Sequence, residues 1–460
     1  MNQATCLTPC DDVGQAMFDL ATDLFPICRS VTGPGVRETL ARLQRIIPVE
    51  IHEVPTGTHV FDWRVPREWD IRDAFVKDEQ GRRIIDFRQS NLHVVNGSIP
   101  IRRTMSWHEL KPHLHTLPEH PSWIPYRTCF HTEDWGFCSS HEQFRQLEEF
   151  GDRSYEVCID ATLQDGSLTL GELYLPGTNA DEILVSTHVC HPSLANDNLS
   201  GIAVATYFAR ILQERQRKFS YRFLFIPATI GAITWLSLNE QHLPRIKHGW
   251  VLSGVGDSGP LTYKKSRRGT STVDQTFEYV LRQSNSPYTI QEFEPFGYDQ
   301  RQYCSPGIDL PIGGLMRTPN GCYAEYHTSA DNLDFLRPES LADSLAICLE
   351  VSAVLEGNEV YRSLNPKCEP CLGPRGLYHA FGSRADCGAL QKAILWVLNL
   401  SDGSHSLLAI AQRANISFDL IREAADLLLQ HQLLATANNT TFSFSHLGGT
   451  QENHYECCLL

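Results

Sequence analysis

The sequence EILVSTHVCHPSLANDNLSG, from Glu182 to Gly201, carries the strongest local signal in the chain. Its first seven residues are typical of a strand that is buried on both faces and ends at His188. A proline-containing loop follows, and Asn196-Asp197-Asn198 then leads into an apolar helix. The pattern predicts imidazoles and a carboxylate beyond the carboxyl end of one strand, where open α/β sheets place their chemistry.

Neutral imidazole and carboxylate groups together suit Zn²⁺ or a similar divalent ion. A purely structural interpretation is also open, in which Asp197 or Asn198 caps the helix and His188 is a hydrogen-bonded core histidine. Three such groups within ten residues at a strand end favour the metal site.

Two later segments are expected to lie near the carboxyl end of the same strand. AEYHTSAD, from Ala324 to Asp331, places His327 in a polar loop before a helix, although Asp331 is equally a candidate helix cap. Asp257 follows the strand WVLSGV. Aspartate is common in turns after strands, so Asp257 alone carries little weight.

Apolar strands alternate with helices between about residues 150 and 356. Strands that are apolar on both faces, each followed by a helix, indicate a mainly parallel sheet covered on both sides. The predicted strands are YEVCIDATL, EILVSTHV, YRFLFIPA and GWVLSGVG, and the predicted helices begin near Leu199, Thr272 and Pro338. The fold class is therefore α/β.

A length of 460 residues predicts about three folding units. The residue pattern along the chain changes at several points, which indicates where these units begin and end. Residues 11–47 indicate two helices around a break at Thr32-Gly33-Pro34-Gly35. The expected units are an α/β domain (1–62 and 150–364), an inserted β-rich domain (63–149), a linker (365–384) and a C-terminal winged-helix domain (385–460).

The would-be recognition helix FDLIREAADLLLQHQLL carries Asp419, Glu423 and Asp426 against Arg422 alone. That is the wrong sign for a groove lined with phosphates. The composition favours a role in protein contact or packing over DNA binding.

The chain has 39 Lys and Arg against 54 Asp and Glu, a net charge of −15, which argues against non-specific binding to nucleic acid or anionic membranes. We find no apolar run of about 20 residues and no secretory signal, and we expect a cytoplasmic protein. The 15 cysteines are interpreted mostly as reduced, buried residues. A homo-oligomer is compatible with the sequence.

The strand-His, Asn-Asp-Asn-x-Ser-Gly and late His-Thr-Ser-x-Asp motifs resemble those of zinc exopeptidases of the leucyl aminopeptidase and glutamate carboxypeptidase type. WRVPREWDIRDAF, DWGFC, GLMRTPNGCYAEYHTSADNLDF and the winged-helix tail are more closely similar to a bacterial family of aminopeptidase-like proteins with an inserted β domain. Members of that family are often associated with polysaccharide or specialised-metabolite biosynthesis. The resemblance extends from about residue 12 to the end.

The resemblance implies that His188, Asp197 and His327 are metal ligands for one or two zinc ions, with Asp197 in the place of a bridging carboxylate. It places Asp257 near the next acidic ligand, while His191 is either a ligand or a substrate-facing group. The implied reaction is hydrolysis of an amide or peptide bond in a small or peptide-like substrate by a metal-activated water.

The sequence departs from the family pattern twice. His188-Val189-Cys190 replaces His-x-Asp and so lacks a carboxylate that would orient the imidazole. Ala228 stands where the pattern Pro-Glu-Thr-Ile-Gly supplies the general base. The chain is therefore a natural non-catalytic member that binds metal and a ligand, or an enzyme in which Glu325 or Asp299 has taken over, or a chain in which Ala228 was introduced.

Candidate substrate contacts lie in the later loops. Arg267, Arg301 and Arg317 have the geometry to hold a carboxylate or phosphate, and the alternative is a solvated surface charge run. Asp299 is a candidate for binding a substrate amine, and Tyr326 is grouped with the substrate contacts. The leading interpretation is a metal-dependent aminopeptidase-like hydrolase, with a pseudoenzyme as its rival and a transcriptional regulator disfavoured by charge.

Overall fold

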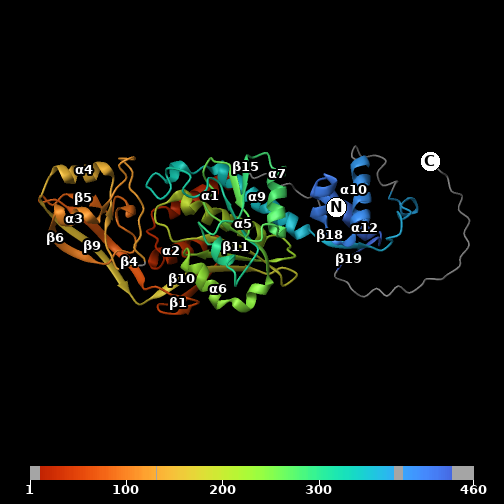
Figure 1. Ribbon diagram of the computed structural model, residues 1–460, viewed down its shortest axis with the longest axis horizontal. Helices are drawn as coiled ribbons and strands as arrows, with labels where there is room; N and C mark the ends of the chain where they lie inside the picture. The colour runs from red at the N-terminus through yellow and green to blue at the C-terminus, as the bar shows by residue number, and fades with distance from the viewer. Residues whose placement is uncertain (1–10, 131, 378–386, 438–460) are drawn as a thin grey trace, which may run out of the picture. The chain divides into compact units, whose positions relative to one another are not determined.

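The structure is a computed structural model that describes residues 11–130, 132–377 and 387–437. It divides into two compact units, Met1–Glu356 and Gly357–Leu460, the second drawn in blue in Figure 1.

An eight-stranded sheet forms the centre of the first unit, in the order β1-β10-β12-β11-β13-β16-β14-β15. The four central strands are parallel, and all seven residues of β11 (Glu182–His188) are buried between β12 (Ser220–Ile226) and β13 (Ile246–Leu252). The other strands are β1 (Glu50–Pro55), β10 (Ser167–Leu175), β14 (Leu261–Lys264), β15 (Tyr288–Gln291) and β16 (Ile312–Met316). The predicted α/β class with a mainly parallel core is confirmed, and His188 lies at the carboxyl edge of the central strands.

Helices cover this sheet, and those predicted from Thr272 and Pro338 begin at those residues. α5 (Gly201–Gln213) packs against α1 (Asp11–Leu24), β11 and β13, while α6 (Ile230–Leu238) packs against β10. The remaining helices are α2 (Pro34–Leu43), α7 (Thr272–Gln283), the short α8 (Gln300–Tyr303) and α9 (Pro338–Gly357). Trp235 of α6 and Trp250 of β13 are among the largest fully buried side chains.

The inserted domain is built on a second, antiparallel sheet in the order β5-β4-β9-β6 (Figure 1). Its strands are β4 (Glu68–Lys77), β5 (Arg83–Asp86), β6 (Ile101–Ser106) and β9 (Ser154–Gln164), and it is covered by α3 (Trp107–Leu110) and α4 (His141–Glu149). Short pairs are formed by β2 (His59–Val60) with β3 (Trp63–Arg64) and by β7 (Leu114–His115) with β8 (Phe137–Cys138).

The structure corrects one expected boundary of the inserted domain. The segment YEVCIDATL was predicted as a strand of the α/β core, but it lies in β9, which pairs with β4 and β6. The inserted sheet therefore reaches Gln164 rather than ending at 149. A short apolar run has the same pattern at the centre of an antiparallel sheet as in a parallel one, so periodicity cannot separate them.

The second unit contains α10 (Cys387–Leu400), α11 (Leu407–Ala414) and α12 (Phe418–Gln430), as predicted for a winged helix. β17 (Val360–Ser363) pairs with β18 (Asp402–Ser406) and β19 (Leu434–Thr436). β17 precedes residues 365–377, so this described part of the predicted linker follows the first strand of the unit. The part of the predicted winged-helix domain after Ala437 lies outside the described residues.

Among the described helices, none combines the length and apolar composition needed to cross a bilayer.

The turn between α1 and α2 ties the N-terminal helices to the inserted domain. Gly33 has a φ of 96°, and a Cβ atom at this position would lie 2.1 Å from the main-chain oxygen of Trp69 in β4. Pro34 then begins α2, where a missing amide hydrogen costs nothing. Only glycine fits this approach.

Gly33→Ala should lower the free energy of unfolding more than Gly81→Ala. Gly81 has a φ of 79°, but a Cβ atom added there would meet no atom within 4 Å, so alanine costs only about 1–2 kcal/mol of backbone strain. The clash with Trp69 should add about 1–3 kcal/mol. Denaturant titration of both variants measures the difference, and equal losses would show that Trp69 moves away freely.

Candidate metal centre

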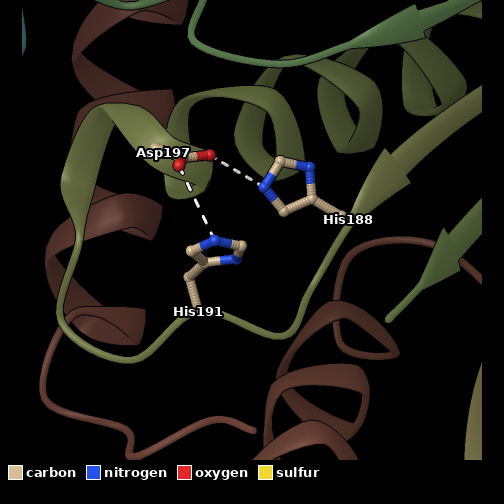
Figure 2. Close-up of side chains that lie close together, drawn as sticks. All are labelled: His188, His191 and Asp197. Atoms are coloured by element: carbon tan, nitrogen blue, oxygen red, sulfur yellow. Dashed lines mark hydrogen bonds and ion pairs between the residues drawn. The ribbon is translucent and has the colours of Figure 1, made fainter. Parts of the chain in front are cut away.

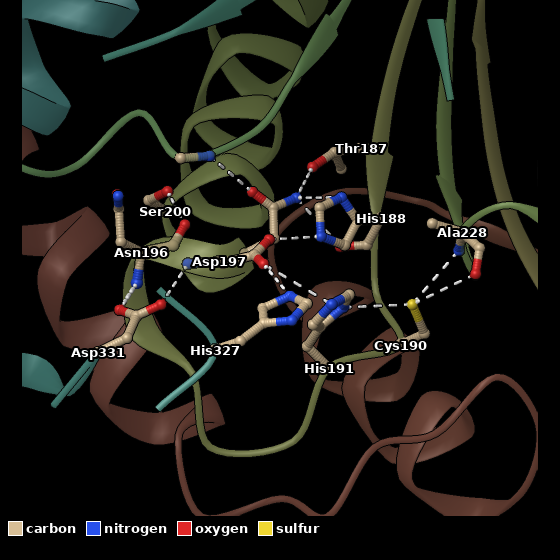
Figure 3. Close-up of polar contacts among 12 residues, drawn as sticks. Thr187, His188, Cys190, His191, Asn196, Asp197, Ser200, Ala228, His327 and Asp331 are labelled. Carbon is tan, nitrogen blue, oxygen red and sulfur yellow. Dashed lines mark hydrogen bonds and ion pairs between the residues drawn. The ribbon is translucent and has the colours of Figure 1, made fainter. Parts of the chain in front are cut away.

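Three imidazoles converge on the carboxylate of Asp197 (Figure 3), and Figure 2 shows two of them, His188 and His191. Nε2 of His188 lies 2.8 Å from Oδ1, while Nε2 of His327 lies 3.0 Å and Nε2 of His191 3.7 Å from Oδ2. His188 ends β11, His191 lies in the loop that follows, and Asp197 lies in the turn before α5. His327 comes from the loop after β16, so the sequence-predicted groups from two distant segments meet at one edge of the sheet.

Burial and the contacts between the imidazoles and the carboxylate together determine the charge state of this cluster. The side chains of His188 and Asp197 are fully shielded from solvent, and that of His191 is 13% exposed. Burial alone would raise the pKa of Asp197, but the neighbouring imidazoles, His191 first, reverse this and hold it well below its usual range. Burial lowers the pKa of His191 to about 3. The site therefore combines an ionised carboxylate with a neutral imidazole, the forms that bind metals.

A second aspartate fixes the turn that carries Asp197. The segment Ala195–Ser200 departs from helical geometry at Asp197 and Asn198. Oδ1 of Asp331 accepts a hydrogen bond from the amide of Asn196 at 2.6 Å, and Oδ2 accepts one from the amide of Asp197 at 2.9 Å. Asp331 was predicted only as a helix cap, whereas in the structure it orients the carboxylate turn from across the site (Figure 3).

Each histidine is oriented by a different neighbour. The ring of His188 stacks on Tyr298 with centroids 4.9 Å apart, and the side-chain Nδ2 of Asn198 lies 3.3 Å from its Nδ1. Nε of the buried Arg29 donates a hydrogen bond to the main-chain oxygen of His191 at 2.7 Å. The loop carrying His191 is therefore held by the N-terminal segment.

Cys190 and Ala228, the two departures from the family pattern, lie against each other. Sγ of Cys190 accepts a hydrogen bond from the amide of Ala228 at 3.3 Å and lies 3.4 Å from Nδ1 of His191. Burial raises the pKa of the Cys190 thiol to about 12, so it stays neutral. The thiol thus orients His191 rather than His188, and it does not replace the missing carboxylate.

Asp299, at the start of α8, is 1% exposed. Within the described part of the chain, neither of its carboxylate oxygens has a hydrogen-bond partner. Burial raises the pKa of Asp299 to about 7, and the nearby charges of His188 and Arg301 only partly oppose this. A buried carboxylate without a partner is costly, which marks the residue as a functional candidate.

Asp257 does not join the cluster. Its carboxylate accepts hydrogen bonds from Asn196 Nδ2 at 3.0 Å, Thr318 Oγ1 at 2.7 Å and the amide of Gly259 at 2.7 Å. These bonds use both oxygens to hold the neighbouring loops, so the ligand role of Asp257 stays a prediction that its present contacts do not favour.

Two of the three candidate arginines are also engaged elsewhere. Arg317 is buried and donates to the main-chain oxygen of Gly259 and to Asp343, and the exposed Arg267 pairs with Asp309. Tyr326 lies at the site, with its ring stacked on His327 at 4.0 Å. Glu325 accepts a hydrogen bond from Thr328 through its main-chain oxygen, and within the described residues its side chain forms no hydrogen bond with the cluster.

Arg29, Tyr126 and Tyr298 also support the site, although no sequence motif pointed to them. Tyr126 lies in the inserted domain, with its ring 5.2 Å from the rings of both His191 and His327. Tyr298 is the neighbour of the candidate Asp299 in the sequence, and only its aromatic character could have pointed to it. Arg29 and Tyr126 carry no local signal, because their partners are more than 60 residues away.

The donor set fits a divalent metal. One ligand atom from each of His188, His191 and Asp197 lies within 4.8 Å of the others, and the imidazole of His327 reaches the same carboxylate. Imidazole nitrogen and carboxylate oxygen are common zinc ligands.

Comparisons with known proteins agree with this architecture. Residues 18–358 match the family described as "Domain of unknown function (DUF4910)", and residues 359–436 match a winged helix-turn-helix family. A Clostridium acetobutylicum protein, provisionally named as a polysaccharide biosynthesis protein with an aminopeptidase-like domain, is 49% identical over 92% of this chain and 96% of its own length.

Solved structures show the same fold. A crystal structure of a C. acetobutylicum protein, provisionally called a peptidase, is 47% identical, with a TM-score of 0.86 over 93% of this chain and 97% of that one. A zinc aminopeptidase from Bacillus subtilis matches with a TM-score of 0.54 at 14% identity, over 74% of this chain and 93% of that one. The second likeness shows the fold alone.

His188→Ala should reduce the zinc content of the protein, whereas Asp257→Asn should leave it unchanged. The first removes a donor, and the second weakens a hydrogen-bonded support at a cost of about 1–3 kcal/mol in unfolding free energy. Elemental mass spectrometry after zinc loading and desalting measures both. Wild-type protein without metal would contradict the site, and loss of metal in Asp257→Asn would place Asp257 among the ligands.

Proposed function

The chain belongs to the family described as "Domain of unknown function (DUF4910)", and we propose that it is a metal-dependent, aminopeptidase-like hydrolase of amide bonds. The observation that carries the proposal is the buried Asp197 carboxylate with three imidazoles around it, at the carboxyl edge of a parallel sheet. Open α/β sheets bind their substrates at that edge.

His188, Asp197 and His327, with His191 beside them, would hold one or two zinc ions. Oδ1 of Asp197 faces His188 while Oδ2 faces His327, which supports a bridging role for this carboxylate. When bound, zinc supplies a Lewis acid for the amide carbonyl and lowers the pKa of a water to about 7.

We propose Asp299 as the group that accepts the proton of the attacking water. Ala228 has no proton-transfer capacity, and the pKa of Asp299, raised to about 7 by burial, suits a general base near neutral pH. Glu325 is the weaker candidate, because it is only half-buried and its hydrogen bond to Thr328 is made through the main chain.

The substrate is proposed to be a small or peptide-like amide. Arg267 and Arg317 are already paired, so Arg301 and Tyr326 remain as candidate substrate contacts. The name of the C. acetobutylicum relative supports a role in polysaccharide biosynthesis. The alternative function, a pseudoenzyme that binds metal and a ligand, is favoured by one observation, the contact between Cys190 and Ala228 at the position of the usual base.

The winged-helix unit is proposed to contact protein rather than DNA. On α12, Arg422 is paired with Asp419 at 3.4 Å, which leaves the helix without a free cation among its described residues.

The described cysteines are unbridged, which supports the proposal of a reducing, cytoplasmic location.

Ala228→Glu should raise hydrolysis of an aminoacyl p-nitroanilide by the zinc-loaded protein, by less than the full ~10²- to 10⁴-fold of a positioned base because Asp299 already supplies part of that effect. Ala228→Gln is the matched control, with similar length and no basicity. A chelator should abolish the activity of the wild type and of the glutamate variant. Absence of hydrolysis in both, with metal bound, would favour the pseudoenzyme.

Asp299→Asn should lower hydrolysis and yet stabilise the metal-free protein at pH 8. The carboxyl pKa is about 7 in the folded chain and about 3.9 in the unfolded chain, so the folded state loses stability as pH rises between these values. Asparagine removes that cost, about 2–4 kcal/mol at pH 8 and near zero below pH 4. Denaturant titrations at both pH values measure the effect, with Glu325→Gln as control. Destabilisation at pH 8 would show that the carboxylate has a favourable partner.

A further inference from the structure

A segment of the inserted domain reaches the loop that carries His327. Pro125 forms an isolated antiparallel bridge with Thr328, and the amide of Tyr126 donates to the main-chain oxygen of His327 at 2.7 Å. The amide of Ser329 donates to the oxygen of Ile124 at 2.8 Å, and the amide of Ile124 donates to Oγ of Ser329 at 2.9 Å. Main-chain pairing therefore attaches the His327 loop to another domain.

The side chain of Tyr126 lies between two histidines. Its ring centroid is 5.2 Å from that of His191 and 5.2 Å from that of His327, and the residue is 7% exposed. His327 has a φ of 56°, in the left-handed region that non-glycine residues adopt only when their surroundings hold them there. The bridge and the Tyr126 ring supply such surroundings.

The same domain also holds the loop that carries His191. Nδ2 of Asn96 donates to the main-chain oxygen of Arg29 at 2.9 Å, and Arg29 donates to the oxygen of His191. Nδ2 of Asn91 donates to Oγ of Ser193 at 2.8 Å. Both loops thus depend on contacts from the inserted domain, although the domain supplies none of the proposed ligands.

We propose that Tyr126 is a positioning residue, whose ring sets the separation of His191 and His327 and thereby makes metal binding dependent on the docking of the inserted domain. This inference rests on the proposed function, because it concerns the same metal site. Neighbours that orient metal ligands commonly change metal affinity by about 10- to 100-fold when they are removed. By linkage, the metal should stabilise the docked domain to the same degree.

Zinc affinity, measured by competition with a chromophoric chelator, tests the proposal. Tyr126→Leu keeps the site apolar but removes the ring, and it should weaken zinc binding by about 10-fold or more. Tyr126→Phe keeps the ring, and its zinc affinity should stay within about twofold of wild type. Tyr288→Ala removes a 40%-exposed tyrosine in the edge strand β15, and it should leave the affinity unchanged.

The absorption spectrum of the cobalt-substituted protein gives a second readout, since it reports ligand geometry. It should change in Tyr126→Leu and stay unchanged in Tyr126→Phe. Wild-type affinity and spectrum in Tyr126→Leu, even with a lower unfolding temperature, would overturn the inference, as would equal weakening by the phenylalanine variant. A wild-type protein that binds no metal would instead overturn the proposed function.

Discussion

The burial of one carboxylate organises this molecule. Asp197 carries a charge in a fully shielded position, and a shielded charge is tolerated only when it is paired and hydrogen-bonded. Imidazoles approach its two oxygens from β11, from the loop after β11 and from the loop after β16, and Asp331 fixes its main chain. These partners come from two segments of the chain, β11 with the loop that follows it and the loop after β16, so both segments must be in place before the charge is compensated.

At the same edge of the sheet, the position just after β12 has no ionisable side chain. Just after β12 the chain has Ala228, and the neutral thiol of Cys190 packs against its amide. The ionisable capacity lies instead at the start of α8, in Asp299, which has a raised pKa and no partner for either oxygen within the described residues. An unpaired buried carboxylate reduces stability, and such a cost is commonly retained where function requires it. Ala228 favours the pseudoenzyme interpretation, whereas the unpaired Asp299 favours the hydrolase.

The inserted domain folds around its own core and also supports the loops of the candidate metal site. It has a core of its own, in which Trp107 of α3 packs against Tyr155 of β9, yet its segment at Ile124 to Tyr126 pairs with the His327 loop. Arg29, from the N-terminal helical region, holds the His191 loop from the other side. A metal site that is supported by three segments so distant in sequence is sensitive to how they dock.

The sequence by itself determined the sheet class, the positions of β11, β12 and β13, the starts of α7 and α9 and the three helices of the C-terminal unit, because these depend on local periodicity. It also pointed to His188, His191, Asp197 and His327, since each lies in a polar motif after a strand. Only the tertiary structure decided that YEVCIDATL belongs to the inserted sheet, that Asp257 and Arg317 are engaged elsewhere, and that Tyr126 and Arg29 support the site. Those outcomes depend on contacts between residues far apart in the chain. Patterns among neighbouring residues do not predict such contacts.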